Sequence, residues 1–260
     1  MKSWIKISLW TLSICSVIAL FGFVTQREQQ AMCEGIDINI QRKNKSNEFI
    51  SAKEVEQTVR NLGYSIEGQY MSDFELAHLE QVFKSKPSVK DAEVYTTVDH
   101  KLKLDITERT PIARLFNMYG ESFYLDREGT IMPLSNNYTA RVMVINGKLN
   151  IPYSTLFSEE NEQNKFYRNK LNELFELVQF IHKDPFWRAQ ISQVFIDKYQ
   201  EVVLIPKVGN HKIVVGEWVD LAEKFGKLKI LYNKGLPNTG WNEYHTINLK
   251  FKNQIVCSKK

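Results

Sequence analysis

The hydrophobic pattern begins with one uninterrupted run of uncharged residues over positions 7–24, which reads ISLWTLSICSVIALFGFV. The rest of the chain is polar and mixed in charge, without a second run of this kind. An α-helix rises about 1.5 Å per residue, so the run would extend roughly 27 Å, nearly the hydrocarbon thickness of a bilayer (about 30 Å). The pattern predicts a single membrane anchor over residues 7–25, after a short cytoplasmic tail over residues 1–6.

Other interpretations of this run fit less well. A cleaved signal peptide needs small residues near its end, where this chain has Phe21, Phe23 and Val24. A lipoprotein signal at Cys15 is disfavoured by the bulky Ile14 before it and by the apolar residues after it. A buried core helix would need no membrane, but such a helix rarely stands alone at the N-terminus of a chain. An amphipathic surface helix would show a charged face, which this run lacks.

Basic residues predict the orientation of the anchor. Lys2, Lys6 and the N-terminal amine precede the run, and Arg27 follows it. The positive-inside rule then places the N-terminus in the cytoplasm and the residues from about Gln26 onward outside it. The sequence therefore predicts a single-pass protein of the cytoplasmic (inner) membrane with the bulk of its chain in the periplasm.

Residues 33–108 follow the order strand, helix, helix, strand, strand. Apolar and polar residues alternate as in half-buried strands over residues 35–41, 92–98 and 102–106. Asp99-His100 suits a tight turn between the last two segments. A three-stranded sheet with both helices on one face would bury all the apolar stripes, leaving the other face and at least one edge open.

Each of the two helices carries a start signal. Ser51 with Glu54 forms the pattern of a capping box, and Ser72 with Glu75 repeats it. Gly63 suits the end of the first helix. The predicted buried stripes are Val55, Val59 and Leu62 in the first helix and Leu76, Leu79, Val82 and Phe83 in the second.

The pattern over residues 109–257 predicts a β-rich domain with two or more helices. The whole chain is therefore predicted to have an α+β fold. Pro111 cannot donate to a strand ladder, so a strand should end or change sheets there. Asp126 and Gly129 have the spacing of a tight type I turn between two short strands. The further predicted elements are a strand over 141–145, a helix carrying Tyr167, Leu171, Leu174, Val178 and Ile181, a hairpin of 191–196 and 201–205, a strand over 212–215, a helix carrying Leu221, Phe225, Leu228 and Leu231, and a closing strand over 244–251.

Composition adds little chemistry to this picture. The formal net charge is +4, with basic and acidic residues interleaved, which favours a solvated surface over a nucleic-acid-binding stripe. The chain lacks the common motifs of hydrolases, metalloproteases and nucleotide-binding proteins. The histidines are scattered and are predicted to be surface or half-buried residues: His78, His100, His182, His211 and His245. We expect no catalytic residue, no metal and no cofactor.

Several other polar and aromatic residues have simple interpretations. Asp126 and Glu128 fit turn chemistry better than acid–base catalysis. Two of the three cysteines, Cys33 and Cys257, lie outside the predicted anchor and could form a disulfide or remain separate thiols. Three tryptophans could line a carbohydrate platform, although packing between elements is the favoured interpretation: Trp187, Trp218 and Trp241.

Taken together, these features resemble the FtsQ/DivIB family of bacterial cell-division proteins. The strand–helix–helix–strand–strand unit over 33–108 resembles a POTRA domain, a module that binds polypeptide partners. The other features that carry the resemblance are the single anchor, ERTPIAR at 108–114, YLDREGTIMPLS at 124–135, IVVG at 213–216 with KFGKL at 224–228, and INLKFKNQIV at 247–256. The short N-terminal tail departs from the many relatives that have a longer one.

The resemblance implies a function in binding rather than in catalysis. The implied partners are FtsB and FtsL, small bitopic division proteins, which would add a strand to an open sheet edge. By position, the implied binding strand falls on residues 248–254, with Lys250, Phe251 and Asn253 as the partner-binding residues. Lys250 could pair with an acidic residue and Phe251 could fill a partner pocket. Alternatively, Phe251 faces the domain's own core.

The resulting prediction is a non-catalytic protein of the cell-division machinery, concentrated at the division septum. It needs no nucleic acid and no small-molecule substrate. The alternative is a membrane-anchored envelope enzyme, for example one that acts on cell-wall polymers. A cleft with converging titratable groups and shifted pKa values would distinguish the alternative.

Overall fold

The computed structural model describes residue 10 and residues 13–17, 31–43, 48–154, 161–217 and 219–259. The predicted cytoplasmic tail and most of the predicted anchor lie outside these residues. Within them, no helix has both the length and the apolar character needed to cross a membrane. The chain divides into two compact units, Met1–Glu108 and Arg109–Lys260, and each is described by itself.

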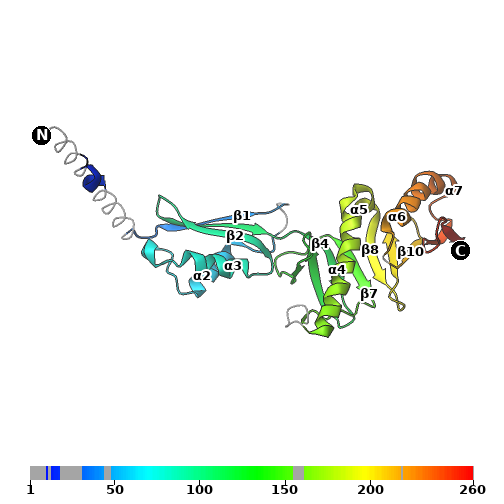
Figure 1. Ribbon diagram of the computed structural model, residues 1–260, viewed down its shortest axis with the longest axis horizontal. Helices are drawn as coiled ribbons and strands as arrows, with labels where there is room; N and C mark the ends of the chain where they lie inside the picture. Colours follow the sequence, from blue (N-terminus) through cyan, green and yellow to red (C-terminus); the bar gives the residue numbers. More distant parts are fainter. Residues whose placement is uncertain are drawn as a thin grey trace. The chain divides into compact units, whose positions relative to one another are not determined.

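The first unit is a three-stranded sheet covered on one face by two helices (Figure 1). The strand order is β1-β3-β2, with β1 parallel and β2 antiparallel to the central β3. Its elements are β1 (Gly35–Gln41), α2 (Ala52–Asn61), the 3₁₀ helix η1 (Met71–Asp73), α3 (Leu76–Lys84), β2 (Val89–Thr96) and β3 (Lys101–Glu108). The predicted order of strands and helices in this unit is confirmed.

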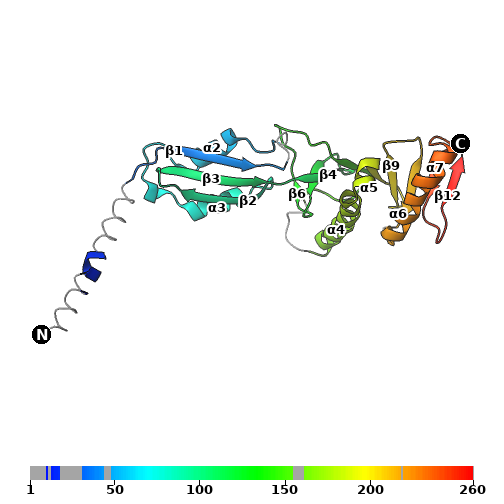
Figure 2. The same ribbon diagram turned by 90° about the horizontal axis from the view of Figure 1, so that it is seen from above.

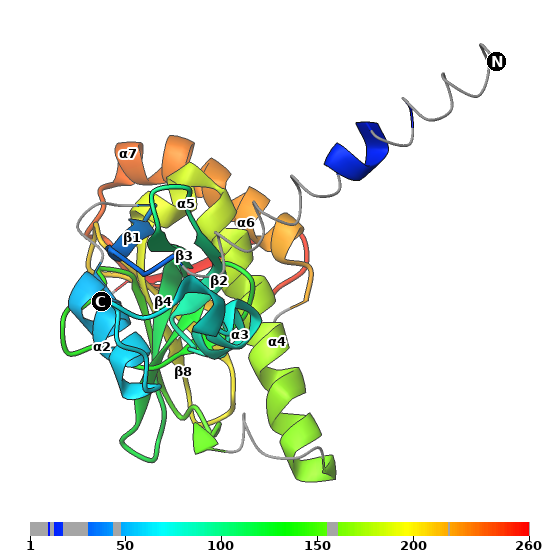
Figure 3. The same cartoon turned by 90° about the vertical axis from the view of Figure 1, so that its left-hand side faces the viewer.

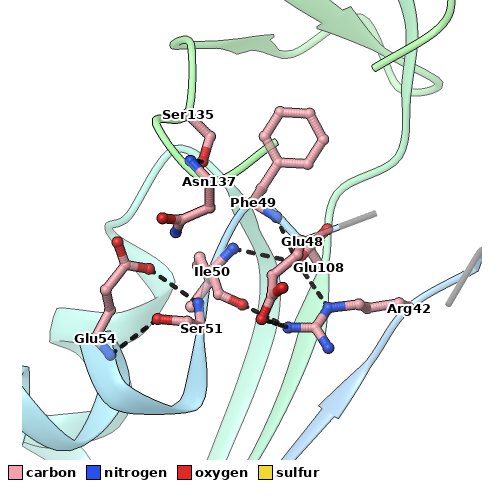
Figure 4. Close-up of polar contacts among 9 residues, drawn as sticks. All are labelled: Arg42, Glu48, Phe49, Ile50, Ser51, Glu54, Glu108, Ser135 and Asn137. Carbon is pink, nitrogen blue, oxygen red and sulfur yellow. Dashed lines mark hydrogen bonds and ion pairs between the residues drawn. The ribbon is translucent and has the colours of Figure 1, made fainter. Parts of the chain in front are cut away.

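The two helices of this unit begin differently. At α2, the Ser51 hydroxyl accepts from the Glu54 backbone N–H at 3.2 Å, and the Glu54 carboxylate accepts from the Ser51 N–H at 2.9 Å (Figure 4). The predicted capping box is therefore confirmed. The box predicted at Ser72 is wrong, because Glu75 is the N-cap of α3 and makes no capping hydrogen bond. Ser72 lies in η1, a tight turn after which Phe74 enters the core and stacks on Tyr64.

The core of the first unit follows the predicted alternation closely. The buried strand residues include Ala92 and Val94 in β2 and all three apolar residues predicted for β3: Leu102, Leu104 and Ile106. Two predicted core positions are exposed, and the predicted core residue Val82 is only half-buried. Leu62 is the C-cap of α2 and is exposed, and Val98 lies beyond β2 in the turn to β3, with 99% of its surface exposed. That turn places His100 in the left-handed region, at φ 54°.

The second unit is built on a nine-stranded mixed sheet in the order β12-β11-β10-β9-β8-β7-β4-β5-β6. Strands β4, β7 and β8 are mutually parallel, as are β10 and β11, and the other neighbours are antiparallel. The strands are β4 (Pro111–Phe116), β5 (Ser122–Asp126), β6 (Ile131–Met132), β7 (Met143–Gly147), β8 (Ile191–Ile196), β9 (Val202–Pro206), β10 (Lys212–Gly216), β11 (Tyr244–Asn248) and β12 (Val256–Lys259).

Helices pack along this sheet and close its core (Figure 1, Figure 3). The long α4 buries the stripe predicted for it, from Tyr167 to Ile181. Trp187 of α5 is buried and packs edge-on against Phe225 of α6, with ring centroids 5.1 Å apart. The helices are α4 (Glu162–Lys183), α5 (Pro185–Gln190), α6 (Leu221–Ile230), the π-helix η3 (Leu231–Gly235) and α7 (Leu236–Thr239).

The closing strand is shorter than predicted. It ends at Asn248, whose side-chain oxygen accepts from the Lys250 backbone N–H at 3.0 Å. This local bond offers the backbone an alternative to the ladder, so the chain turns, and Asn253 adopts a left-handed conformation at φ 62°. The chain then returns antiparallel as β12. The strand predicted at 141–145 is likewise displaced, to β7.

The joint between the units is predicted more closely. Strand β3 ends at Glu108, and Pro111 begins β4 in the other sheet. The Asp126–Gly129 turn joins β5 to β6, and one Asp126 carboxylate oxygen accepts the backbone N–H groups of Glu128 and Thr130, each at 2.8 Å. The other oxygen accepts from Arg109 at 2.9 Å. Asp126 thus shapes the turn and is itself neutralised.

Candidate partner-binding surface

The C-terminal strand β12 forms one edge of the nine-stranded sheet (Figure 2). It pairs with β11 on one side, in the register Asn248 with Val256, Ile247 with Cys257 and Thr246 with Ser258. Within the described residues no strand pairs with its other side. Val256, Ser258 and Lys259 are exposed. An unpaired edge of this kind can accept another strand through main-chain hydrogen bonds.

The three predicted partner-binding residues lie together, in the turn between β11 and β12 rather than in a strand. Lys250 is exposed, and its ammonium contacts the Glu201 carboxylate at 2.5 Å. This hydrogen bond is the main reason why the pKa of Lys250 is raised. Phe251 is 46% exposed, so the alternative that it faces the core is wrong. Leu249, two residues earlier, is buried instead. Asn253 holds the left-handed position of the turn.

A hollow of about 400 Å³ lies beside this turn. Its apolar part is formed by Val219, Leu249 and Phe251. Its charged lining mixes both signs: Glu201, Glu217, Asp220, Glu223, Lys224, Lys227, Lys250 and Lys252. The Lys227 ammonium contacts the Glu223 carboxylate at 3.1 Å and also donates to the Phe251 carbonyl oxygen at 3.2 Å. Several of the charges are therefore paired within the surface itself.

Sequence reasoning missed most residues of this surface. Glu201 lies 49 positions from Lys250, and Lys227 lies 24 positions from Phe251. Neither residue belongs to a motif or a periodic stripe that predicts the contact. The one local signal that could have located the turn is Asn248 two residues before Lys250, the spacing at which a side-chain oxygen caps a turn.

The described residues hold no cluster of three or more His, Cys, Asp or Glu side chains with the geometry of a metal site. One histidine differs from prediction: His211 is buried. Its Nε2 lies 2.9 Å from the Tyr232 hydroxyl and its Nδ1 lies 3.4 Å from the Trp241 carbonyl oxygen, and burial lowers its pKa. His211 therefore holds η3 against β10 as part of the core.

The tryptophans and cysteines have structural environments as well. Trp187 is buried and Trp241 packs on the rim of the core, while Trp218 lies outside the described residues. Cys33 is buried in the first unit, Cys257 is half-buried in β12, and both are free thiols. Burial raises the pKa of the Cys257 thiol.

Comparison with known proteins agrees with this architecture. Residues 31–107 match the model of POTRA-like domains, and residues 110–258, more than half of the chain, match the model described as FtsQ/DivIB, C-terminal related. The chain belongs to the FtsQ/DivIB family. A relative from the family is the cell division protein FtsQ of Geotalea daltonii, which is 26% identical over 207 residues, covering 78% of this chain and 70% of that protein.

Proposed function

We propose that this FtsQ/DivIB-family chain is a non-catalytic cell-division protein that binds other membrane-anchored division proteins. Residues 7–25 would anchor it in the inner membrane, with residues 1–6 in the cytoplasm and the rest in the periplasm, at the division septum. Residues 33–108 form the POTRA-like unit. Residues 109–257 supply the surface for FtsB and FtsL. Family membership and the presence of cell division protein FtsQ among the relatives support this role.

The observation that carries the binding mechanism is the free edge of β12. A partner segment would add a tenth strand there, next to Val256–Lys259. Alternate residues of an edge strand direct their backbone groups outward, so this four-residue strand offers about four main-chain hydrogen bonds. At about 0.5–1.5 kcal/mol each, they contribute at most about 6 kcal/mol. Micromolar binding needs about 8 kcal/mol, so side-chain contacts must supply the remainder.

The turn from Lys250 to Asn253 adjoins this edge and offers such contacts. Phe251 is half exposed over the hollow and gains apolar burial when a partner covers it. Lys250 already contacts Glu201, so part of its attraction for an acidic partner residue is offset by that contact. We therefore assign the larger share of the side-chain contribution to Phe251 and the smaller share to Lys250.

A pair of proline substitutions tests strand addition. Adjacent residues of β12 direct their N–H groups to opposite sides, so Cys257→Pro and Ser258→Pro each remove one class of hydrogen bond. The variant that loses an N–H group bonded to β11 should have a lower melting temperature than wild type. The variant that loses an N–H group on the free edge should keep the wild-type melting temperature, but the full-length protein in lipid nanodiscs should no longer capture FtsB. Wild-type capture by a proline variant of wild-type stability would contradict strand addition.

Substitutions in the turn test the side-chain contacts. Phe251→Ala should weaken FtsB capture about tenfold or more, since it removes roughly 1.5–3 kcal/mol of apolar burial. Tyr199→Ala is the matched control, because Tyr199 is an exposed aromatic residue in the β8–β9 turn. Lys250→Glu should weaken capture less than Phe251→Ala. Equal capture by Phe251→Ala and by the control would exclude Phe251 from the interface.

A further inference from the structure

A second hollow of about 400 Å³ lies in the second unit, where the parallel strands β4, β7 and β8 begin and α4 ends. It shares no lining residue with the hollow beside β12. Its lining comes from two helices, from strands and from the segment before β7. The lining residues are Ile112, Arg141, Val142, Met143, Ile181, His182, Arg188, Ile191, Ser192 and Lys207.

The floor of this hollow is apolar and firmly held. Ile112 at the start of β4, Ile181 near the end of α4 and Ile191 at the start of β8 are each at most 3% exposed. All three belong to the main core of the second unit, and Met143 packs against that core. These three isoleucines are almost closed off, so the aliphatic surface open to a ligand comes from the half-buried Val142 and Met143, and it favours an apolar group.

The rim of the hollow is basic. Arg141, Arg188 and Lys207 are exposed and come from three separate segments. The backbone N–H of Lys207 donates to the Gln190 carbonyl oxygen at 2.7 Å, which fixes the end of β9 beside the end of α5. This bond places the Lys207 backbone beside a residue two positions after Arg188, and Arg141 comes from the segment before β7.

None of the described residues that line the hollow is acidic. The acidic residue nearest in sequence to Arg188 is Asp184, which accepts from the Phe186 N–H at 2.8 Å and contacts the Lys229 ammonium at 3.1 Å. The hollow beside β12, in contrast, alternates acids with lysines. A rim of one sign above apolar walls concentrates anions, and arginine binds carboxylates through two parallel hydrogen bonds.

We propose that this hollow binds a short acidic segment of a partner polypeptide, in which a carboxylate side chain stands beside a large apolar side chain. The apolar side chain would occupy the apolar floor, and the carboxylates would contact Arg141, Arg188 and Lys207. A free inorganic anion would leave the floor unused. The volume of about 400 Å³ is sufficient for a few side chains. The site is separate from β12, and the proposal stands without strand addition.

The experiment uses the full-length protein in nanodiscs with labelled isoleucine methyl groups. Three fluorescein-labelled hexapeptides serve as probes: Glu-Phe-Glu-Leu-Glu-Phe, its lysine analogue and its glutamine analogue. The acidic peptide should bind and shift the methyl signals of Ile112, Ile181 and Ile191, and the lysine peptide should bind at least tenfold more weakly. Equal binding of the acidic and lysine peptides, or binding without shifts at these methyl groups, overturns the proposal.

Charge reversal on the rim provides the second readout. Arg141→Glu, Arg188→Glu and Lys207→Glu should each weaken the acidic peptide at least tenfold, with FtsB capture unchanged. Lys198→Glu is the matched control, because Lys198 is an exposed cation in the turn beyond the opposite end of β8. If a charge-reversal variant has a lower melting temperature than wild type, the glutamine variant at the same position is used in its place. Peptide binding that survives all three rim changes, or that inorganic phosphate displaces completely at equal concentration, overturns the assignment to an acidic peptide.

Discussion

The end of β3 in the first unit and the turn after β11 in the second unit each contain an ion pair, but the two pairs are built differently. Glu108 is 4% exposed and accepts from the Phe49 and Ile50 backbone N–H groups at 3.2 and 3.3 Å and from Arg42 at 3.3 Å (Figure 4). Lys250 and Glu201 form an ion pair on the protein surface, and it consists of the single contact between the ammonium and one carboxylate oxygen.

The difference indicates which pair serves the fold and which can serve a partner. Removing Glu108 would leave two buried backbone N–H groups without an acceptor and take the carboxylate away from Arg42. Replacing this ion pair by contacts to a partner would therefore cost stability. The Arg42 guanidinium is fixed further by donating to the Ile50 carbonyl oxygen at 2.6 Å. The ammonium of Lys250 can leave Glu201 for water or for a partner at little cost. Exposure thus separates a structural pair from an exchangeable one.

The largest expected effect that tests this comparison is that of Glu108→Ala. It should lower the free energy of unfolding of the first unit by about 3 kcal/mol, because it leaves the buried Phe49 and Ile50 N–H groups without an acceptor and removes the carboxylate from the half-buried Arg42. Chemical denaturation followed by circular dichroism measures this change. Glu201→Ala is the control in the exposed pair. A Glu108→Ala protein as stable as the Glu201→Ala protein would remove the distinction.

The pH dependence of stability sharpens the same comparison. Burial raises the pKa of Glu108 above its usual value of 4.5, although its hydrogen bonds to Phe49, Ile50 and Arg42 act in the opposite direction. A raised pKa in the folded state means that Glu108 contributes most to stability below its usual pKa, and that the contribution is lost as pH rises through the raised value. The stability of wild type relative to Glu108→Gln should therefore fall as pH rises. A constant or rising difference across this titration would contradict the raised pKa.

A smaller effect is expected in the turn itself. Asn253 has a positive φ, which a β-carbon without a local hydrogen-bonding group tolerates poorly, so Asn253→Ala should destabilise by about 1 kcal/mol. Asn253→Gly relieves the strain and should keep wild-type stability. FtsB capture by the glycine variant then separates two roles. Full capture indicates that Asn253 shapes the turn, whereas lost capture at wild-type stability indicates that its amide contacts the partner.

The smallest effect on stability is expected for Glu201→Gln. The pair with Lys250 is exposed, so the free energy of unfolding should stay close to that of wild type. The same change frees Lys250 for a partner carboxylate, so capture of FtsB should stay equal or become tighter. Calorimetric titration of the full-length protein measures both the affinity and its salt dependence. Weaker capture would assign the partner contact to Glu201 instead of Lys250.

Local patterns in the sequence predicted the elements of the first unit well. The Ser51–Glu54 box and the alternation from Leu102 to Ile106 are satisfied by residues a few positions apart, or by one buried face of a strand. The same reasoning failed at Ser72, where burial of Phe74 replaced an equally good capping pattern. It also failed for the end of the closing strand, because the alternation from Ile247 continues to Phe251, past the point where Asn248 ends the strand.

By itself, the sequence determined the order of elements in the first unit, most of the buried stripes, the Asp126 turn and the resemblance to the FtsQ/DivIB family, because each depends on the spacing of neighbouring residues. The tertiary structure alone decided that β12 is an edge, that Lys250 contacts Glu201, and that three cations surround an apolar hollow. These features join residues tens of positions apart. No local spacing encodes them, because strand pairing and packing select them only once the whole sheet has formed.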